Sequence, residues 1–216
     1  MKRLIIYDLD GTLVDTGEDI AEAVNHMLNV LTGAPLPAEE IRRYVGKGLH
    51  DLVRRCLKTD DEACVERGTQ VFGEYYGRHL TDHSRLYPQA RQTLDYFRDR
   101  AQAIITNKPQ PFARDLLAGL GVADYFVEII APGSGFPKKP DPTAVHALMA
   151  AHHLSAEEVV LIGDSLIDVE TGRNTGVFTA VLSHGFQDQE ALRLAAPDLL
   201  VNNFEELLAM ARRKKW

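Results

Sequence analysis

Residues 5–16, IIYDLDGTLVDT, decide the fold of this chain, because an apolar strand ends there on two closely spaced aspartates. In an extended backbone, side chains two positions apart point to the same face, so Asp8 and Asp10 lie together. Two carboxylates in one partly buried place repel each other unless they share a proton or a cation lies between them. The stretch therefore predicts either a shared proton or a bound metal, and the rest of the chain must decide between them.

The composition of the chain limits the classes of function that it can have. Its 216 residues, 45% of them hydrophobic, are enough for a sizeable core. The net charge of −7 argues against a nucleic-acid-binding surface, which is usually basic. No apolar run approaches the length of a membrane helix or of a signal-peptide core. We expect a cytoplasmic protein with two free cysteines, with neither membrane nor nucleic acid as a partner, and a monomer and a homodimer both stay open.

Short apolar runs recur along the chain and have the character of buried parallel strands, since they are rich in Val and Ile and do not alternate with polar residues. The runs are RLIIY (3–7), QAIIT (102–106), FVEIIA (126–131), EVVLIG (158–163), FTAVLS (178–183) and DLLV (198–201). Helical patterns at 111–121, 142–154 and 168–176 separate several of them. Strands that alternate with helices predict an α/β fold with a doubly wound parallel sheet.

One interval interrupts this alternation. Residues 15–85 contain helical patterns such as DIAEAVNHMLNVL and LHDLVRRCL, and no convincing strand. We therefore expect an α-helical cap subdomain at 15–85, inserted into an α/β core that is formed by residues 1–14 and 86–216.

Polar side chains follow the apolar runs, where the carboxyl ends of parallel strands form the ligand-binding crevice of an open sheet. Asp8 and Asp10 follow the first run, Thr106 and Asn107 end or follow the second, and Asp164 follows the fourth. Together with Asp168, the aspartates form a set of hard oxygen ligands, which suits Mg²⁺ better than zinc. The sequence thus favours a metal over a shared proton. The segment PKKPDP (137–142) adds two lysines, one of which can neutralise a transferring phosphoryl group.

Four segments in this order, DLDGTLVDT, IITN, KPDP and GDSLID, resemble the four motifs of the haloacid dehalogenase-like superfamily. The resemblance spans the whole chain, and the helical insertion is similar to the cap of the phosphoglycolate phosphatase-like branch. It implies that Asp8 is a nucleophile that forms an aspartyl phosphate. It also implies that Asp10 acts as the general acid for the leaving oxygen and then as the general base for water.

The same resemblance assigns the metal ligands. The Asp8 carboxylate, the Asp10 backbone carbonyl and Asp164 are expected to hold Mg²⁺, and Asp168 is expected to orient the metal shell or a bound water.

The resemblance also assigns the phosphate-binding residues. Thr106, Asn107 and Lys139 are expected to grip the phosphate, with Lys138 the less favoured of the two lysines. Relatives in this branch further imply a cis peptide bond between Lys139 and Pro140.

The resemblance implies a phosphoric monoester hydrolase that acts on a small phosphorylated metabolite, with 2-phosphoglycolate as the first substrate to test. Lys47, in the cap segment YVGKGL, is the predicted contact for the substrate carboxylate. A sugar-phosphate phosphatase, a pyrophosphatase and a β-phosphoglucomutase stay open, whereas Asp10 disfavours a dehalogenase, since those enzymes lack this second aspartate. An alternative of another class is a non-enzymatic, receiver-like switch that keeps one phosphate per chain.

Overall fold

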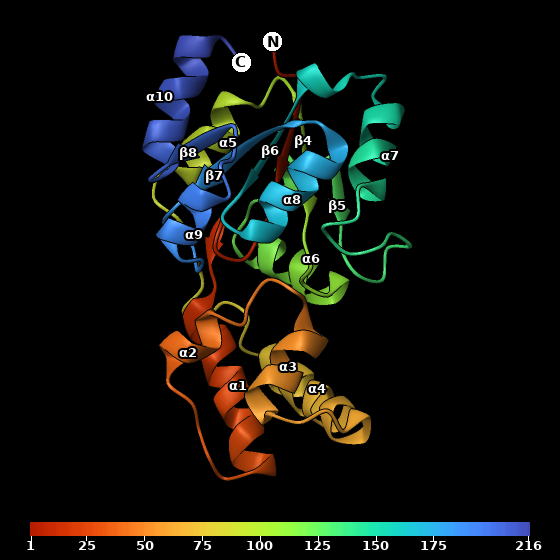
Figure 1. Ribbon diagram of the computed structural model, residues 1–216, viewed down its shortest axis with the longest axis vertical. Coiled ribbons are helices and arrows are strands. Elements are labelled where there is room, and N and C mark those ends of the chain that lie inside the picture. Colours follow the sequence, from red (N-terminus) through yellow and green to blue (C-terminus); the bar gives the residue numbers. More distant parts are fainter.

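Six parallel strands form the central sheet, in the order β5–β4–β1–β6–β7–β8 (Figure 1). The computed structural model describes all 216 residues. The strands are β1 (Leu4–Tyr7), β4 (Ala101–Ile105), β5 (Glu128–Ile130), β6 (Val159–Gly163), β7 (Phe178–Leu182) and β8 (Leu199–Val201). Five of the strands lie within the predicted apolar runs, and β4 begins one residue before its run at 102–106, which confirms the doubly wound parallel sheet. β1 lies between β4 and β6, so its carboxyl end opens at the middle of the sheet.

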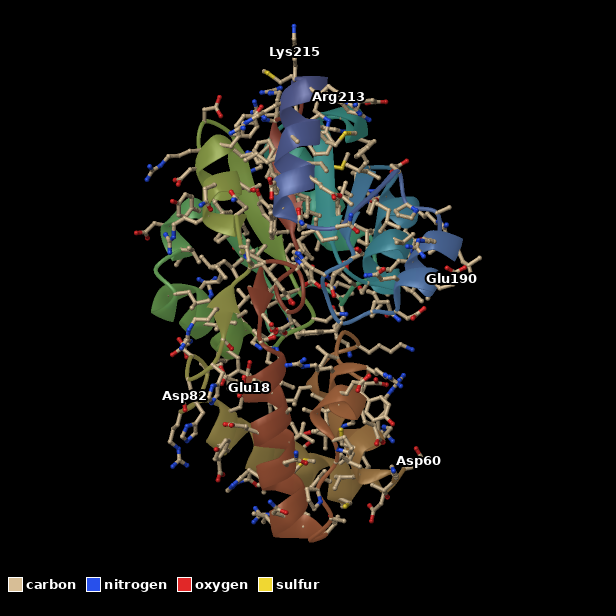
Figure 2. The ribbon with its side chains drawn as sticks, turned by 90° about the vertical axis from the view of Figure 1, so that its left-hand side faces the viewer. Glu18, Asp60, Asp82, Glu190, Arg213 and Lys215 are labelled. Atoms are coloured by element: carbon tan, nitrogen blue, oxygen red, sulfur yellow. The ribbon has the colours of Figure 1, made fainter.

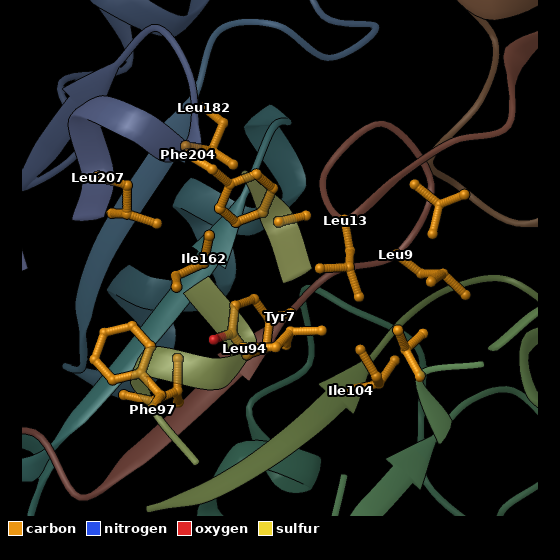
Figure 3. Packing of buried hydrophobic residues seen from close by; sticks show 14 of the residues in the cluster. Tyr7, Leu9, Leu13, Leu94, Phe97, Ile104, Ile162, Leu182, Phe204 and Leu207 are labelled. Carbon is orange, nitrogen blue, oxygen red and sulfur yellow. The ribbon is translucent and has the colours of Figure 1, made fainter. Parts of the chain in front are cut away.

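Helices cover both faces of this sheet, which explains why the strands are apolar throughout. Helices α5 (Ala90–Tyr96), α6 (Gln110–Gly119) and α10 (Phe204–Lys214) pack on one face, and α7 (Thr143–Ala151) packs on the other. The remaining core elements are α8 (Leu166–Thr175), α9 (Gln189–Leu194) and short 3₁₀ turns at Ala123–Tyr125 and Ala156–Glu158. Figure 3 shows the first of these interfaces, where Tyr7 and Ile162 of the sheet meet Leu94, Phe97 and Phe204 of the helices. Leu4 and Ile6 point into the opposite layer, as the two-residue repeat of a strand requires.

A second, helical lobe lies below the sheet in Figure 1 and has a hydrophobic core of its own. It contains α1 (Gly17–Leu31), α2 (Ala38–Arg42), α3 (Leu49–Leu57) and α4 (Glu62–Tyr76). These helices all lie within the stretch 15–85, and we refer to this lobe as the cap. None of the helices in the chain is both long enough and apolar enough to span a bilayer.

The two chain segments that join the lobes are tied to each other. Strand β2 (Val14–Asp15) pairs with β3 (Arg85–Leu86) in an antiparallel arrangement. The buried carboxylate of Asp19 accepts hydrogen bonds from the His83 and Ser84 backbone N–H groups, both at 2.8 Å, and from the Ser84 hydroxyl at 2.6 Å. Figure 2 shows Glu18 and Asp82 at this narrow junction, whereas Arg213 and Lys215 lie at the far end of the core lobe. The junction therefore fixes where the cap begins and how it meets the carboxyl ends of the strands.

Candidate active site

The two aspartates of the first motif leave the sheet at the end of β1. The Asp8 backbone N–H donates to the Ile162 carbonyl at 2.8 Å, so the parallel pairing continues one residue past the strand. Leu9 points into the core, and this leaves Asp8 and Asp10 together on the opposite side, as their spacing predicts. Asp8 is buried, and Asp10 is partly exposed toward the cap. Both line the cavity between the two lobes.

Asp164 follows β6 and is held against the loop after β1. Its Oδ1 accepts a hydrogen bond from the Thr12 hydroxyl at 2.6 Å, and its Oδ2 accepts one from the Phe186 backbone N–H at 3.1 Å. The backbone comes so close to this carboxylate that a Cβ added at Gly11 or Gly185 would overlap Asp164 Oδ2. Gly11 also has a φ of +82°, a conformation that glycine adopts readily. These contacts fix the Asp164 carboxylate beside Asp8.

Asp168 lies in the first turn of α8 and is completely buried. Its Oδ2 accepts hydrogen bonds from the Asp164 and Ser165 backbone N–H groups and from the Ser165 hydroxyl, so it forms a capping box with Ser165. Its Oδ1 accepts a hydrogen bond from Lys139 Nζ at 2.7 Å. Asp168 therefore anchors both the start of α8 and a buried lysine.

Lys139 reaches the site from the loop before α7. The Lys139–Pro140 peptide bond is cis, as predicted. The side chain of Lys139 is only 2% exposed, and its Nζ lies 2.8 Å from Asp8 Oδ1 as well as 2.7 Å from Asp168 Oδ1. Its neighbour Lys138 points to the cap instead, where its Nζ donates to the Lys47 carbonyl at 3.1 Å. Of the two lysines left open by the sequence, Lys139 is therefore the one that faces the candidate nucleophile.

The buried charges of the site do not balance. Asp8, Asp164 and Asp168, which we call the acidic cluster, bring carboxylate oxygens within 4.8 Å of one another, and Lys139 is the one cation that pairs with them. Burial raises the pKa of Asp8 to about 6, although Lys139 opposes this rise. Burial, with the charges of Asp168 and Asp8, holds the pKa of Asp164 well above its usual range. The protein alone does not stabilise all three negative charges.

The donor set of the acidic cluster fits a hard divalent cation. Asp8 Oδ1 is buried and accepts no hydrogen bond of good geometry, even though the Lys139 ammonium lies 2.8 Å away. All three side chains offer oxygen, and no cysteine or histidine is among them, which suits Mg²⁺ rather than zinc. A bound cation would offset the excess negative charge.

Thr106 and Asn107 follow β4 and lie beside the same cavity. The Thr106 hydroxyl oxygen accepts a hydrogen bond from the Lys108 backbone N–H at 3.2 Å, so its own proton is free to be donated. The Asn107 side chain binds both backbone groups of Lys139, at 2.9 Å and 3.0 Å, and also the Gly46 carbonyl of the cap at 2.9 Å. Here Asn107 joins the Lys139 loop to the cap.

Lys108 and Tyr76 are site residues that sequence reasoning missed. Lys108 Nζ donates to Asp10 Oδ1 at 2.9 Å and to the Tyr76 hydroxyl at 2.6 Å, and Thr16 donates to the same Asp10 oxygen at 2.8 Å. Lys108 directly follows Thr106 and Asn107, so its position after β4 could have identified it from the sequence as a site residue. No sequence signal indicated Tyr76, at the end of α4, because its contact with Lys108 forms only where the two lobes meet.

A small cavity lies between the two lobes. Asp8, Asp10 and the residues after β4 form its floor, and apolar side chains of the cap form much of its roof. Gly46 and Gly48 line it, but the side chain of Lys47 is exposed and is not among the lining residues. The structure thus brings together all of the predicted site residues except Lys47.

The sequence and fold of this chain are similar to those of known proteins. A family model described as haloacid dehalogenase-like hydrolase matches residues 5–182. A phosphoglycolate phosphatase of Vibrio parahaemolyticus is 33% identical over 95% of this chain and 94% of its own length. One from Vibrio cholerae is 34% identical over 95% of each chain. A crystal structure of a predicted phosphoglycolate phosphatase from Haemophilus somnus has a TM-score of 0.92 and 26% identity, and covers 97% of this chain and 98% of that chain.

Proposed function

The chain belongs to the haloacid dehalogenase-like hydrolase family, and we propose that it is a Mg²⁺-dependent phosphatase that hydrolyses a small phosphorylated metabolite, with 2-phosphoglycolate as the first candidate. The observation that carries this proposal is the buried Asp8 carboxylate beside Lys139, at the floor of a cavity closed by the cap. We choose 2-phosphoglycolate as the first candidate because relatives named phosphoglycolate phosphatase match nearly the full length of the chain.

In the proposed reaction, an oxygen of Asp8 attacks phosphorus and the ester oxygen leaves, which gives an aspartyl phosphate. Lys139, 2.8 Å from Asp8, is placed to offset negative charge on the phosphoryl oxygens as the bond forms. The Thr106 hydroxyl lines the same cavity and has a proton to donate to one of these oxygens. Mg²⁺, held by Asp8, Asp164 and the Asp10 carbonyl, would supply further neutralisation of phosphoryl charge when bound.

In the proposed reaction Asp10 carries out the proton transfers. In the first step its carboxyl gives a proton to the leaving oxygen, and in the second it takes a proton from the water that attacks the aspartyl phosphate. Hydrogen bonds from Thr16 and Lys108 to Oδ1 fix the orientation of this side chain. Closure of the cap limits the access of bulk water, which strengthens every electrostatic interaction in the cavity.

Turnover of small phosphomonoesters tests this function. We expect continuous release of inorganic phosphate from 2-phosphoglycolate in the presence of Mg²⁺, and loss of that release when EDTA is added. The rate of phosphate release from 2-phosphoglycolate is compared with the rates from sugar phosphates, pyrophosphate and a phosphopeptide. Phosphate is measured colorimetrically over many turnovers. Release that stops at one phosphate per chain would instead indicate a switch, and full activity in metal-free buffer would contradict the role of Mg²⁺.

Metal binding can be tested without reference to turnover. A ligand that binds only the folded state raises its stability, so the melting temperature of the wild type is expected to rise with Mg²⁺ concentration. Asp164→Asn should remove most of this rise. Asp168→Asn should lower stability but keep more of the Mg²⁺ response, because Asp168 is already engaged by Lys139 and Ser165. Equal Mg²⁺ responses in the wild type and in Asp164→Asn would remove Asp164 from the metal site.

A further inference from the structure

We propose that Lys108 of the core and Tyr76 of the cap together bind a second anionic group of the substrate, a carboxylate close to the phosphoryl ester. This inference rests on the proposed phosphatase function and deepens it, since it selects small phosphorylated acids over neutral phosphate esters. It also assigns the carboxylate contact to a pair of residues that the sequence alone did not indicate.

Lys108 is the single cationic side chain that lines the cavity. Its side chain is 3% exposed, and its ammonium lies 4.5 Å from the centre of the Tyr76 ring as well as 2.6 Å from the Tyr76 hydroxyl. Burial lowers the pKa of Lys108, but Asp10 and Tyr76 outweigh this effect and raise it above its usual range, so the ammonium stays charged. A buried ammonium with three N–H donors, two of them used, has one donor left for a substrate oxygen.

Other cations near the cavity are less well placed for this contact. Lys47 is exposed, and Arg43 forms an exposed pair with Glu39 at 2.9 Å. Arg42 packs its guanidinium against Gly17, where an added Cβ would overlap Arg42 Nε. The other side chains around Lys108 are apolar, namely Val45, Leu49, Leu52 and Phe72 of the cap and Phe112 of α6. A carboxylate that enters this cavity loses hydration, and Lys108 is the one cationic side chain in the lining that can compensate for this loss.

The position of Asp10 fixes where such a carboxylate would lie. In the proposed reaction the ester oxygen contacts Asp10, and Lys108 Nζ is 2.9 Å from Asp10 Oδ1. In phosphoglycolate, one methylene group separates the ester oxygen from the carboxylate. A substrate of this length therefore brings its carboxylate next to the group that already holds Asp10, whereas a longer acid would extend into the apolar roof.

The paired residues come from different lobes. Tyr76 ends α4, and its ring also meets Phe112 of α6 edge to face, with the ring centres 5.3 Å apart. The hydroxyl of Tyr76 is buried beside Lys108, so the complete carboxylate contact exists only while the cap rests on the core. Substrate recognition and cap closure are thus linked through one hydrogen bond.

The test compares 2-phosphoglycolate with ethyl phosphate, which has the same chain length and a methyl group in place of the carboxylate. For Lys108→Met we expect KM for phosphoglycolate to rise about thirtyfold or more, because a charge-assisted contact is lost, and KM for ethyl phosphate to change by less than about threefold. The turnover number should fall for both esters, because Lys108 also orients Asp10. For Tyr76→Phe, which keeps the ring, we expect a smaller rise of about fivefold for phosphoglycolate alone.

Lys138→Met is the matched control, since the Lys138 ammonium binds the Lys47 carbonyl of the cap and does not line the cavity. It should leave the ratio of the two KM values unchanged, and so should Lys47→Ala. If Lys108→Met and Tyr76→Phe changed KM for the two esters by the same factor, the carboxylate contact would be overturned and the phosphatase function would stay intact. Wild-type hydrolysis of ethyl phosphate without hydrolysis of phosphoglycolate would also overturn it, whereas hydrolysis of neither ester nor of any other monoester would contradict the proposed function itself.

Discussion

Replacing Asp8 with asparagine is expected to lower kcat by about a thousandfold or more, equivalent to ~4 kcal/mol of transition-state stabilisation. The change keeps the size and shape of the side chain but removes the anionic oxygen that attacks phosphorus. Lys139 keeps its 2.7 Å contact with Asp168 in the variant, so the surroundings of residue 8 should change little. Steady-state phosphate release with a saturating phosphomonoester gives the measurement.

The stability of the same variant provides an independent measurement. Burial raises the pKa of Asp8 from its ordinary value near 3.8 to about 6 in the folded protein, so the folded state binds more protons than the unfolded state between these values. In metal-free buffer the wild type should therefore lose stability as the pH rises from about 4 through 6. Asp8→Asn lacks this contribution, and its melting temperature at pH 8 should equal or exceed that of the wild type.

A suitable control is Asp141→Asn, which changes a carboxylate in the same loop as Lys139 but outside the acidic cluster. We expect it to keep nearly the full turnover number. If Asp8→Asn retained more than about a tenth of the wild-type kcat, a loss below ~1.4 kcal/mol, Asp8 would not be the nucleophile.

Much of the core was predictable from the sequence, because its determinants are local. Buried parallel strands need unbroken apolar runs, and the carboxyl end of each run marks one edge of the sheet, so Asp8, Asp10, Thr106 and Asp164 were placed correctly relative to the fold. Their catalytic and metal-binding roles stay predictions. The two-residue strands β2 and β3 were not predicted, because pairs this short have no periodicity and form only where the two chain segments meet.

The residues that the sequence did not predict depend on contacts between the lobes. Tyr76 and Lys108 are 32 positions apart and meet only because the cap folds over the core. The motif around Lys47 does not determine the direction of its flexible side chain. In the structure the Lys47 side chain is exposed to solvent, whereas the neighbouring Gly46 carbonyl accepts a hydrogen bond from Asn107. Spacing along one segment predicts which residues share a face, but it cannot predict how two separately folded lobes meet.

Lys139→Met is expected to lower kcat by about a hundredfold or more, since loss of one fixed donor to a developing oxyanion has effects of this size. Methionine has similar length and fills the same buried space, so the change removes the charge and little of the packing. In the variant, Asp8 and Asp168 lose their shared partner, and the acidic cluster keeps three buried carboxylates without a protein cation. Breaking a buried ion pair in this way destabilises a protein by about 3–5 kcal/mol.

The conditions that restore stability distinguish lost charge from lost packing. Burial raises the pKa of Asp8, and without Lys139 its ammonium no longer opposes this rise, so the stability of the variant should rise as the pH falls from 8 toward 5. Mg²⁺ should also recover part of the lost stability, because it places positive charge in the same cluster. Lys138→Met, one residue away and directed to the cap, should show neither dependence beyond that of the wild type. If Lys139→Met instead matched Lys138→Met in turnover and in unfolding at every pH, the buried ammonium would contribute neither to phosphoryl transfer nor to the balance of charge, and the excess acidity of the site would need another source of neutralisation.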